Sequence, residues 1–108
     1  APLSRLEYLD LGSNRIQGAG LAHLSRLTRL ETLDLTDNNL TDEGLRHLPS
    51  LPSLKSLILS HNEITGAGIL SLRRLSRLEL LDLSATQVTD DAVDELTRTL
   101  PGLTVHDD

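Results

Sequence analysis

The sequence predicts an α/β solenoid, a right-handed superhelix with four short parallel strands on a concave face and short helices on a convex face. A 24-residue unit recurs four times along the 108-residue chain. Inside each unit the apolar spacing changes from alternation to one apolar residue in every three. A unit of this length cannot bury an apolar face alone, and about three or more must stack to form a continuous core. Four units therefore predict one stacked domain.

The repeated unit has the pattern LxxLxLxxNxL, in which L stands for an aliphatic residue. Its first leucine falls at Leu6, Leu30, Leu54 and Leu78. We divide the single domain 1–108 into repeats 6–29, 30–53, 54–77 and 78–102, followed by a carboxyl-terminal cap or tail at 103–108. The tail stands where a fifth strand motif would begin and lacks that motif.

Each repeat is expected to contain one strand and one helical segment. Alternation at Leu33-Asp34-Leu35-Thr36 has the period of a strand with one buried face. The predicted strands are centred on Leu9, Leu33, Leu57 and Leu81. The following three-residue spacing favours short α or 3₁₀ segments near 21–28, 44–50, 68–76 and 91–99. Pro49 and Pro52 should shorten the second segment.

Polar and small residues at repeated positions are expected to hold the corners. The predicted helix N-caps are Thr41, Thr65 and Thr89. A glycine recurs at Gly20, Gly44 and Gly68, and its replacement by Ala92 favours close packing over a positive φ. A ladder of asparagine amides should satisfy backbone groups of its own and the neighbouring coil, at Asn14, Asn38 and Asn62. Thr86 interrupts this ladder, so the last coil should be tied differently.

Composition and charge exclude several classes of partner. The formal net charge of −6 disfavours nucleic acid and gives no polybasic membrane footprint. The sequence shows no signal-peptide pattern and no long apolar span. It also has no cysteine, which suits a reducing compartment and favours the cytoplasm. A protein or peptide partner, with a basic surface favoured by charge, is therefore expected.

Outward strand positions define the expected concave surface. This surface is expected to be acidic and otherwise to carry small side chains, whereas seven of the nine arginines fall in the helical halves, so the convex side should be more basic. Adjacent strands lie about 4.8 Å apart, and facing Asp10 and Asp34 would repel each other by on the order of 1 kcal/mol. This arrangement indicates either an electrostatic purpose or duplication of a solvated aspartate. Ile58 should lie diagonal to Leu80, forming the nucleus of an apolar patch.

Tyr8, Ile58 and Leu80 are the preferred apolar anchors of this surface. In the alternative interpretation, Leu80 packs under the carboxyl-terminal segment and Tyr8 packs against upstream residues. The complete set of predicted partner-binding residues is Tyr8, Asp10, Thr32, Asp34, Asp37, Ser56, Ile58, His61, Leu80 and Asp82.

Catalytic and cofactor chemistry fits the sequence poorly. Ser60, His61 and Asp37 could be neighbours, but an open strand face provides no closed cleft for a nucleophile. His23 and His47 share one helical slot without the partners of a zinc site. The segment 34–39 lacks calcium-loop spacing, and the loop glycines are not followed by GK[ST]. We therefore predict a protein that is not an enzyme and needs no cofactor or metal.

These motifs resemble the leucine-rich repeat family over residues 6 to about 103. The segment Gly-Ala-Gly-Leu-Ala-His-Leu at 18–24 is similar to short bacterial repeats, including the GALA group. The resemblance implies a horseshoe-shaped interaction module, often joined to separate domains. Members of the GALA group carry an F-box, which is absent here, so ubiquitin ligase assembly is not implied. A structural or scaffold segment without its own ligand is the alternative function.

The two ends of the chain differ from a complete array. Leu3 occupies the slot of Leu27, so residues 1–5 read as the end of an earlier repeat rather than a cap. We interpret the chain as part of a longer array, with an engineered array as the alternative. An uncapped first coil would expose leucines to water, which predicts self-association through that coil.

Overall fold

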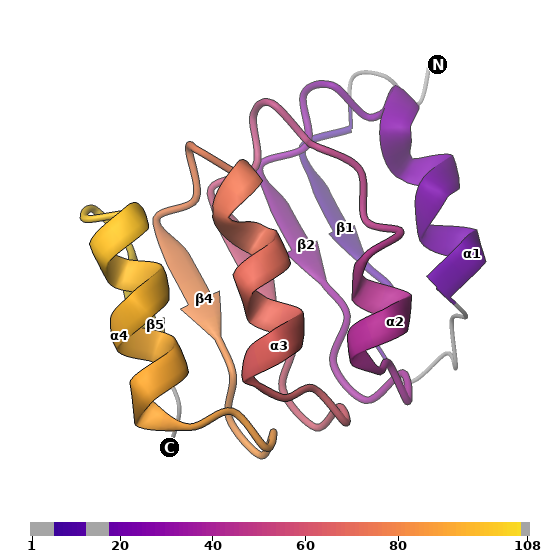
Figure 1. Ribbon diagram of the computed structural model, residues 1–108. Helices are drawn as coiled ribbons and strands as arrows, with labels where there is room; N and C mark the ends of the chain where they lie inside the picture. Colours follow the sequence, from indigo (N-terminus) through magenta and orange to yellow (C-terminus); the bar gives the residue numbers. More distant parts are fainter. Residues whose placement is uncertain (1–5, 13–17, 107–108) are drawn as a thin grey trace.

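Five short parallel strands form one sheet, and helical segments run along one side of it (Figure 1). The computed structural model describes residues 6–12 and 18–106. The strands are β1 (Tyr8–Asp10), β2 (Thr32–Asp34), β3 (Ser56–Ile58), β4 (Leu80–Asp82) and β5 (Thr104–His106). The helical segments are α1 (Gly18–Leu21), η2 (Ala22–Arg26), α2 (Asp42–Leu45), α3 (Gly66–Ile69), η3 (Leu70–Arg74) and α4 (Asp90–Thr99). We call the four repeats coils 1 to 4 and residues 103–106 coil 5.

The four expected strands are confirmed, and a fifth strand corrects their number. The parallel register aligns Leu9, Leu33, Leu57, Leu81 and Val105 across the sheet. β5 joins β4 through hydrogen bonds from Leu83 N to His106 O at 2.6 Å and from Thr104 N to Glu79 O at 2.8 Å. The leucine motif missed β5 because its central residue is valine. A β-branched residue fits a strand equally well once a neighbouring edge is available for pairing.

The helical segments follow the expected order but begin slightly earlier. α1 with η2 covers 18–26, α3 with η3 covers 66–74, and α4 covers 90–99. η2 and η3 are 3₁₀ turns, in agreement with the three-residue apolar spacing. α2 ends at Leu45, well before Pro49, so the predicted shortening of the second segment is confirmed.

Only one of the three predicted N-cap threonines accepts a hydrogen bond from its helix. Thr41 accepts from Gly44 N at 3.4 Å, whereas the side chains of Thr65 and Thr89 make no cap bond. Thr65 instead donates its hydroxyl to Asp42 Oδ2 at 2.5 Å, and its N–H donates to Asp42 Oδ1 at 2.8 Å. The Thr65 hydroxyl thus bonds to the carboxylate of the preceding coil, a charged acceptor that forms a strong hydrogen bond.

Close packing is the reason for glycine at position 68. A Cβ on Gly68 would overlap the carboxylate of Asp42 and lie 2.9 Å from its Cγ. None of the described glycines has a positive φ, as the replacement by Ala92 suggested. The left-handed backbone positions instead include one turn slot, occupied by Asp37, His61 and Ala85 with φ between 56° and 58°.

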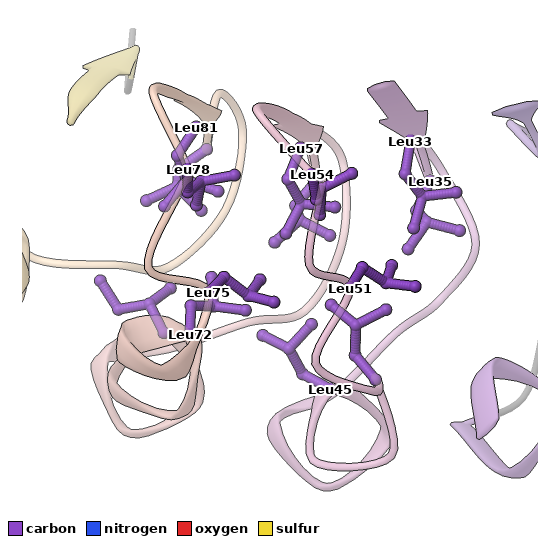
Figure 2. Close-up of a cluster of buried hydrophobic side chains, with 14 of the residues drawn as sticks. Leu33, Leu35, Leu45, Leu51, Leu54, Leu57, Leu72, Leu75, Leu78 and Leu81 are labelled. Carbon is purple, nitrogen blue, oxygen red and sulfur yellow. The ribbon is translucent and has the colours of Figure 1, made fainter. Parts of the chain in front are cut away.

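Leucines from the strands and helical segments meet in the space between them (Figure 2). Leu33, Leu57 and Leu81 come from the strands and Leu45 and Leu72 from the helical side, and all are fully buried. Coil 1 differs from this interior. Its residues Leu6, Leu9, Leu11 and Leu24 are only partly buried.

The predicted asparagine ladder is present in coils 2 and 3. Asn62 Oδ1 accepts from Asn38 N at 2.9 Å and from Leu40 N at 3.0 Å, and Asn62 Nδ2 donates to Leu35 O at 2.9 Å. Asn38 Nδ2 reaches Leu11 O of coil 1 at 2.9 Å. Asn14 lies outside the described residues. Thr86 bonds within its own coil, donating to Leu83 O at 2.6 Å, so the last coil is tied differently as expected.

Candidate functional site

The outward side chains of the strands form the candidate site, which we call the strand face. The expected concave face corresponds to this surface. One row runs through Tyr8, Thr32, Ser56, Leu80 and Thr104, and a second through Asp10, Asp34, Ile58, Asp82 and His106. The middle residue of each inner strand points into the core, so its two neighbours point outward. The helical segments cover the other side of the sheet (Figure 1).

Asp10 and Asp34 face each other in register, as the repeat spacing predicts. Each strand-face aspartate also accepts hydrogen bonds from the residue two positions later. Asp34 Oδ1 accepts from Thr36 N at 3.0 Å and from Thr36 Oγ1 at 2.6 Å. Asp82 Oδ1 accepts from Ser84 N at 3.0 Å and from the Ser84 hydroxyl at 2.7 Å.

These bonds give the aspartates a structural role that the sequence analysis missed. The three-residue pattern Asp-x-Thr or Asp-x-Ser could have predicted this role, since aspartate commonly bonds the backbone two residues later. The turn bonds use one carboxylate oxygen, Oδ1. The strand face therefore remains acidic, although its carboxylates also accept hydrogen bonds from the turns that follow the strands.

Ile58 interrupts the acidic row between Asp34 and Asp82. It is half-buried, as is Leu80, which is paired with Ser56 and therefore lies diagonal to Ile58. The position of the expected apolar pair is thus confirmed. Two carboxylates flank one apolar side chain, each on an adjacent strand at about 4.8 Å.

Tyr8 lies apart from this apolar pair. Its strand β1 is separated from β3 by β2, which places it roughly 10 Å from the Ile58 strand. Its side chain is 56% exposed at the edge of the sheet. The three predicted anchors therefore form two separate positions rather than one cluster.

Asp37 and His61 occupy the left-handed turn slot beyond the strands, where both are exposed. The neighbouring Ser60 is 9% exposed, and its hydroxyl lies 3.2 Å from Thr36 Oγ1. Because Ile58 cannot accept a hydrogen bond, the Ser60 hydroxyl pairs with the preceding coil instead of with its own strand. The Ser60 hydroxyl thus has a structural partner, which disfavours it as a nucleophile.

Among the described arginines, Arg74 of η3 makes a specific contact with the preceding coil. Arg74 Nη2 donates to the carbonyl oxygen of Leu48 and, at 3.5 Å, to that of Arg46. Both carbonyls follow the short helix α2, where a helix end leaves acceptors unsatisfied. Arg74 of coil 3 therefore completes the shortened helical segment of coil 2.

An open depression of about 530 Å³ lies at the amino ends of the last strands, away from the strand face. Its charged lining residues are Lys55, Arg77 and Glu79, which bring two positive charges and one negative charge. Among the described residues there is no group of three or more His, Asp or Glu that could hold a metal ion. No helix in the described part of the chain is long and apolar enough to cross a membrane.

Comparison with known proteins places the chain in a family. The leucine rich repeat profile matches residues 28–88, and a second profile, of two such repeats, matches residues 4–51. No curated protein matches the chain significantly. These profiles identify the repeat class and not the GALA group in particular.

Solved structures agree with this assignment. An internalin from Listeria monocytogenes has 26% identity and a TM-score of 0.73 over 97% of this chain and 29% of its own. Internalin C2 from the same organism has 29% identity and a TM-score of 0.72, covering 94% of this chain and 42% of its own. Leiomodin-1 actin-binding site 2 shares the fold at 18% identity and a TM-score of 0.69, covering 93% of this chain and 68% of that one. The chain thus spans less than a third of the first internalin. It belongs to the leucine-rich repeat family, whose repeats are protein-interaction modules rather than enzymes.

Proposed function

We propose that the chain is a module that binds a protein or peptide through its strand face. The observation that carries the proposal is the row in which Ile58 stands between Asp34 and Asp82. Interfaces combine an apolar centre with a polar rim, and this row provides both on a surface that the helical segments do not cover. The leiomodin-1 fragment, named as an actin-binding site, shows that this fold supports protein binding.

The charge of the strand face favours a basic partner. Asp10, Asp34 and Asp82 lie in one row, and Asp37 adds a fourth carboxylate at the adjacent turn. A partner with Lys or Arg beside an aliphatic residue would complement both the carboxylates and Ile58. The described arginines fall in the helical halves of the repeats.

Peptide display against the folded chain tests this proposal. Peptides that combine basic and aliphatic residues should be enriched, and their binding should be lost in the double variant Asp34→Asn with Asp82→Asn. Asparagine retains Oδ1 as an acceptor for Thr36 and Ser84, so this variant removes charge while keeping the turns. Arg73→Ala with Arg77→Ala is the matched control on the helical side.

A structural segment without a ligand is the alternative function. It predicts that no peptide is enriched above the background of an unrelated protein. Enrichment that depends on Arg73 and Arg77 instead would move the interface to the helical side.

We also propose that the chain self-associates through coil 1. Leu6, Leu9, Leu11 and Leu24 are partly exposed there, although the equivalent leucines of coil 2 are buried. An apolar layer beside an open sheet edge favours association. Light scattering should therefore show a mass that rises with concentration, and a constant monomer mass would refute this second proposal.

A further inference from the structure

The central row of the strand face has a fixed repeat distance. It contains, in strand order, Asp10, Asp34, Ile58 and Asp82, aligned across neighbouring parallel strands. Adjacent strands lie about 4.8 Å apart, so the row spans about 14 Å from Asp10 to Asp82. Equivalent turn bonds hold Oδ1 of all three aspartates, so the carboxylates keep the strand spacing. A ligand that uses the whole row must therefore present one side chain about every 4.8 Å.

Among the regular conformations of a peptide, the α-helix comes nearest to this interval. An extended strand directs alternate side chains to one face, about 6.7 Å apart, and would run ahead of the row by about 2 Å per coil. Polyproline II repeats every three residues, about 9.3 Å, so it would contact only every second coil. An α-helix presents a side chain on one face every three or four residues, at a mean interval of about 5.3 Å. The helix therefore fits each coil to about 0.5 Å.

Ile58 makes one contact per coil important. It lies between Asp34 and Asp82, so a polyproline ligand that reached both carboxylates would pass over Ile58 without placing a side chain on it. A helix can place residues i and i+4 on Asp10 and Asp34, i+7 on Ile58 and i+11 on Asp82. Residues i and i+11 are about 16.5 Å apart, roughly 2 Å more than the row. Flexible lysine side chains can absorb that difference.

The neighbouring row of the strand face also accepts a helix. Its residues from coils 1 to 4 carry no charge and are Tyr8, Thr32, Ser56 and Leu80. This row lies about 6.7 Å away along the strands, and a helix with its side chains is about 10 to 12 Å wide. The ligand would thus cover both rows, and an aliphatic residue over Ile58 could also reach the diagonal Leu80. The chain's own helical segments cover the opposite side of the sheet (Figure 1).

We propose that the strand face binds a basic amphipathic α-helix that lies across the strands, with Lys or Arg at i, i+4 and i+11 and an aliphatic residue at i+7. The helix begins at the Asp10 end, where two adjacent carboxylates complement the positive end of its dipole. This inference rests on the strand-face function proposed above, and it adds the conformation, direction and residue spacing of the ligand.

Fluorescence anisotropy with three labelled, alanine-based peptides tests the proposal on the wild-type chain. The matched peptide has Lys at i, i+4 and i+11 and Leu at i+7, and the shifted peptide exchanges the residues at i+7 and i+11. Both carry a staple on the outer face. The matched peptide should bind about tenfold more tightly, because the shifted peptide places leucine on Asp82 and lysine on Ile58.

The third peptide tests the conformation. It keeps the four contact residues of the matched peptide, but a proline on its outer face replaces the staple and disrupts the helix. Its affinity should fall by about tenfold or more, since proline strongly disfavours the helix interior. A proline peptide that binds as tightly as the matched peptide would overturn the helical ligand.

Moving the apolar position within the protein gives the decisive result. The variant Ile58→Asp with Asp82→Ile keeps the composition of the row and shifts its apolar slot by one coil. It should reverse the ranking and bind the shifted peptide about tenfold more tightly than the matched one, a gain that loss of folding cannot produce. Arg73→Ala with Arg77→Ala is the control and should keep the wild-type ranking.

The outcomes separate this inference from the function on which it rests. If wild type binds the matched and shifted peptides equally, the register is wrong, although strand-face binding would stand. If none of the three peptides binds while peptide display still yields ligands that depend on Asp34 and Asp82, the helix is wrong and the proposed function stands. The absence of both kinds of binding would refute both.

Discussion

The side-chain oxygen of Asn62 accepts a hydrogen bond from the backbone N–H of Asn38 at 2.9 Å, across one full repeat. The same oxygen accepts from Leu40 N, and the amide nitrogen donates to Leu35 O, so one buried side chain serves three backbone groups of coil 2. Thr86, at the same slot of coil 4, donates only within its own coil among the described contacts.

Asn62→Ala should therefore lower the free energy of unfolding by about 3 kcal/mol, since several buried groups lose their partners. Thr86→Ala should cost only about 1 kcal/mol, because it removes one local hydrogen bond. Urea unfolding of both variants measures the difference. Equal losses would show that the ladder adds nothing beyond a single bond.

The pairs Asp42–Gly68 and Gly66–Ala92 place a larger residue opposite a smaller one at successive coil interfaces. Gly68→Ala should cost about 2 kcal/mol, because its methyl group displaces the carboxylate that binds Thr65. Combining it with Asp42→Gly reproduces the pair found between coils 3 and 4. A double-mutant cycle should give a favourable coupling of about 1 to 2 kcal/mol. Additive losses would contradict this steric explanation.

Ala85 is a stabilisation target because its φ of 57° lies in the left-handed region. This conformation costs an ordinary L-residue roughly 1 to 2 kcal/mol. Ala85→Asn and Ala85→Gly should each raise the free energy of unfolding by about 0.5 to 1 kcal/mol. The gain is smaller than the strain that is relieved, because glycine in particular loses more conformational entropy on folding. Thermal unfolding checks this, with Ala67→Gly in α3 as the control that should destabilise.

Arg74 and Arg73 offer a matched comparison of neighbouring arginines. Arg74→Ala should cost about 1 to 2 kcal/mol because the carbonyls of Arg46 and Leu48 lose their donor. The exposed Arg73→Ala should change the free energy of unfolding by less than about 0.5 kcal/mol. Chemical denaturation of the two variants decides whether the inter-coil bonds stabilise coil 2, and indistinguishable midpoints would show that they do not.

Binding kinetics should separate the charged from the apolar part of the strand face. With a basic peptide from display, Asp34→Asn plus Asp82→Asn should slow association and reduce its salt dependence. Ile58→Ala and Leu80→Ala should speed dissociation, each by about 1 to 2 kcal/mol in binding free energy if the side chain is an anchor. Surface plasmon resonance measures both rates. Unchanged rates in all three variants would remove the strand face as the binding surface.

The repeat pattern alone predicted the solenoid, the strand centres, the asparagine ladder and which residues face outward. These features follow from local periodicity, because alternation or three-residue spacing decides on which side of its own coil a residue lies. The positions of Asp10, Asp34, Ile58 and Leu80 on the strand face are therefore readable from spacing. That these residues bind a partner is a prediction from their charge and apolar character.

The contacts between coils were decided only by the tertiary structure. The Thr65 hydroxyl bonds to Asp42 rather than capping its own helix, and Arg74 bonds to carbonyls of coil 2. Val105 lies at the centre of β5, which pairs with β4. Each outcome depends on which atoms of a residue about one repeat away lie within hydrogen-bond distance. The sequence period determines the slot of a residue in its coil, but only the stacking of coils determines what each slot touches.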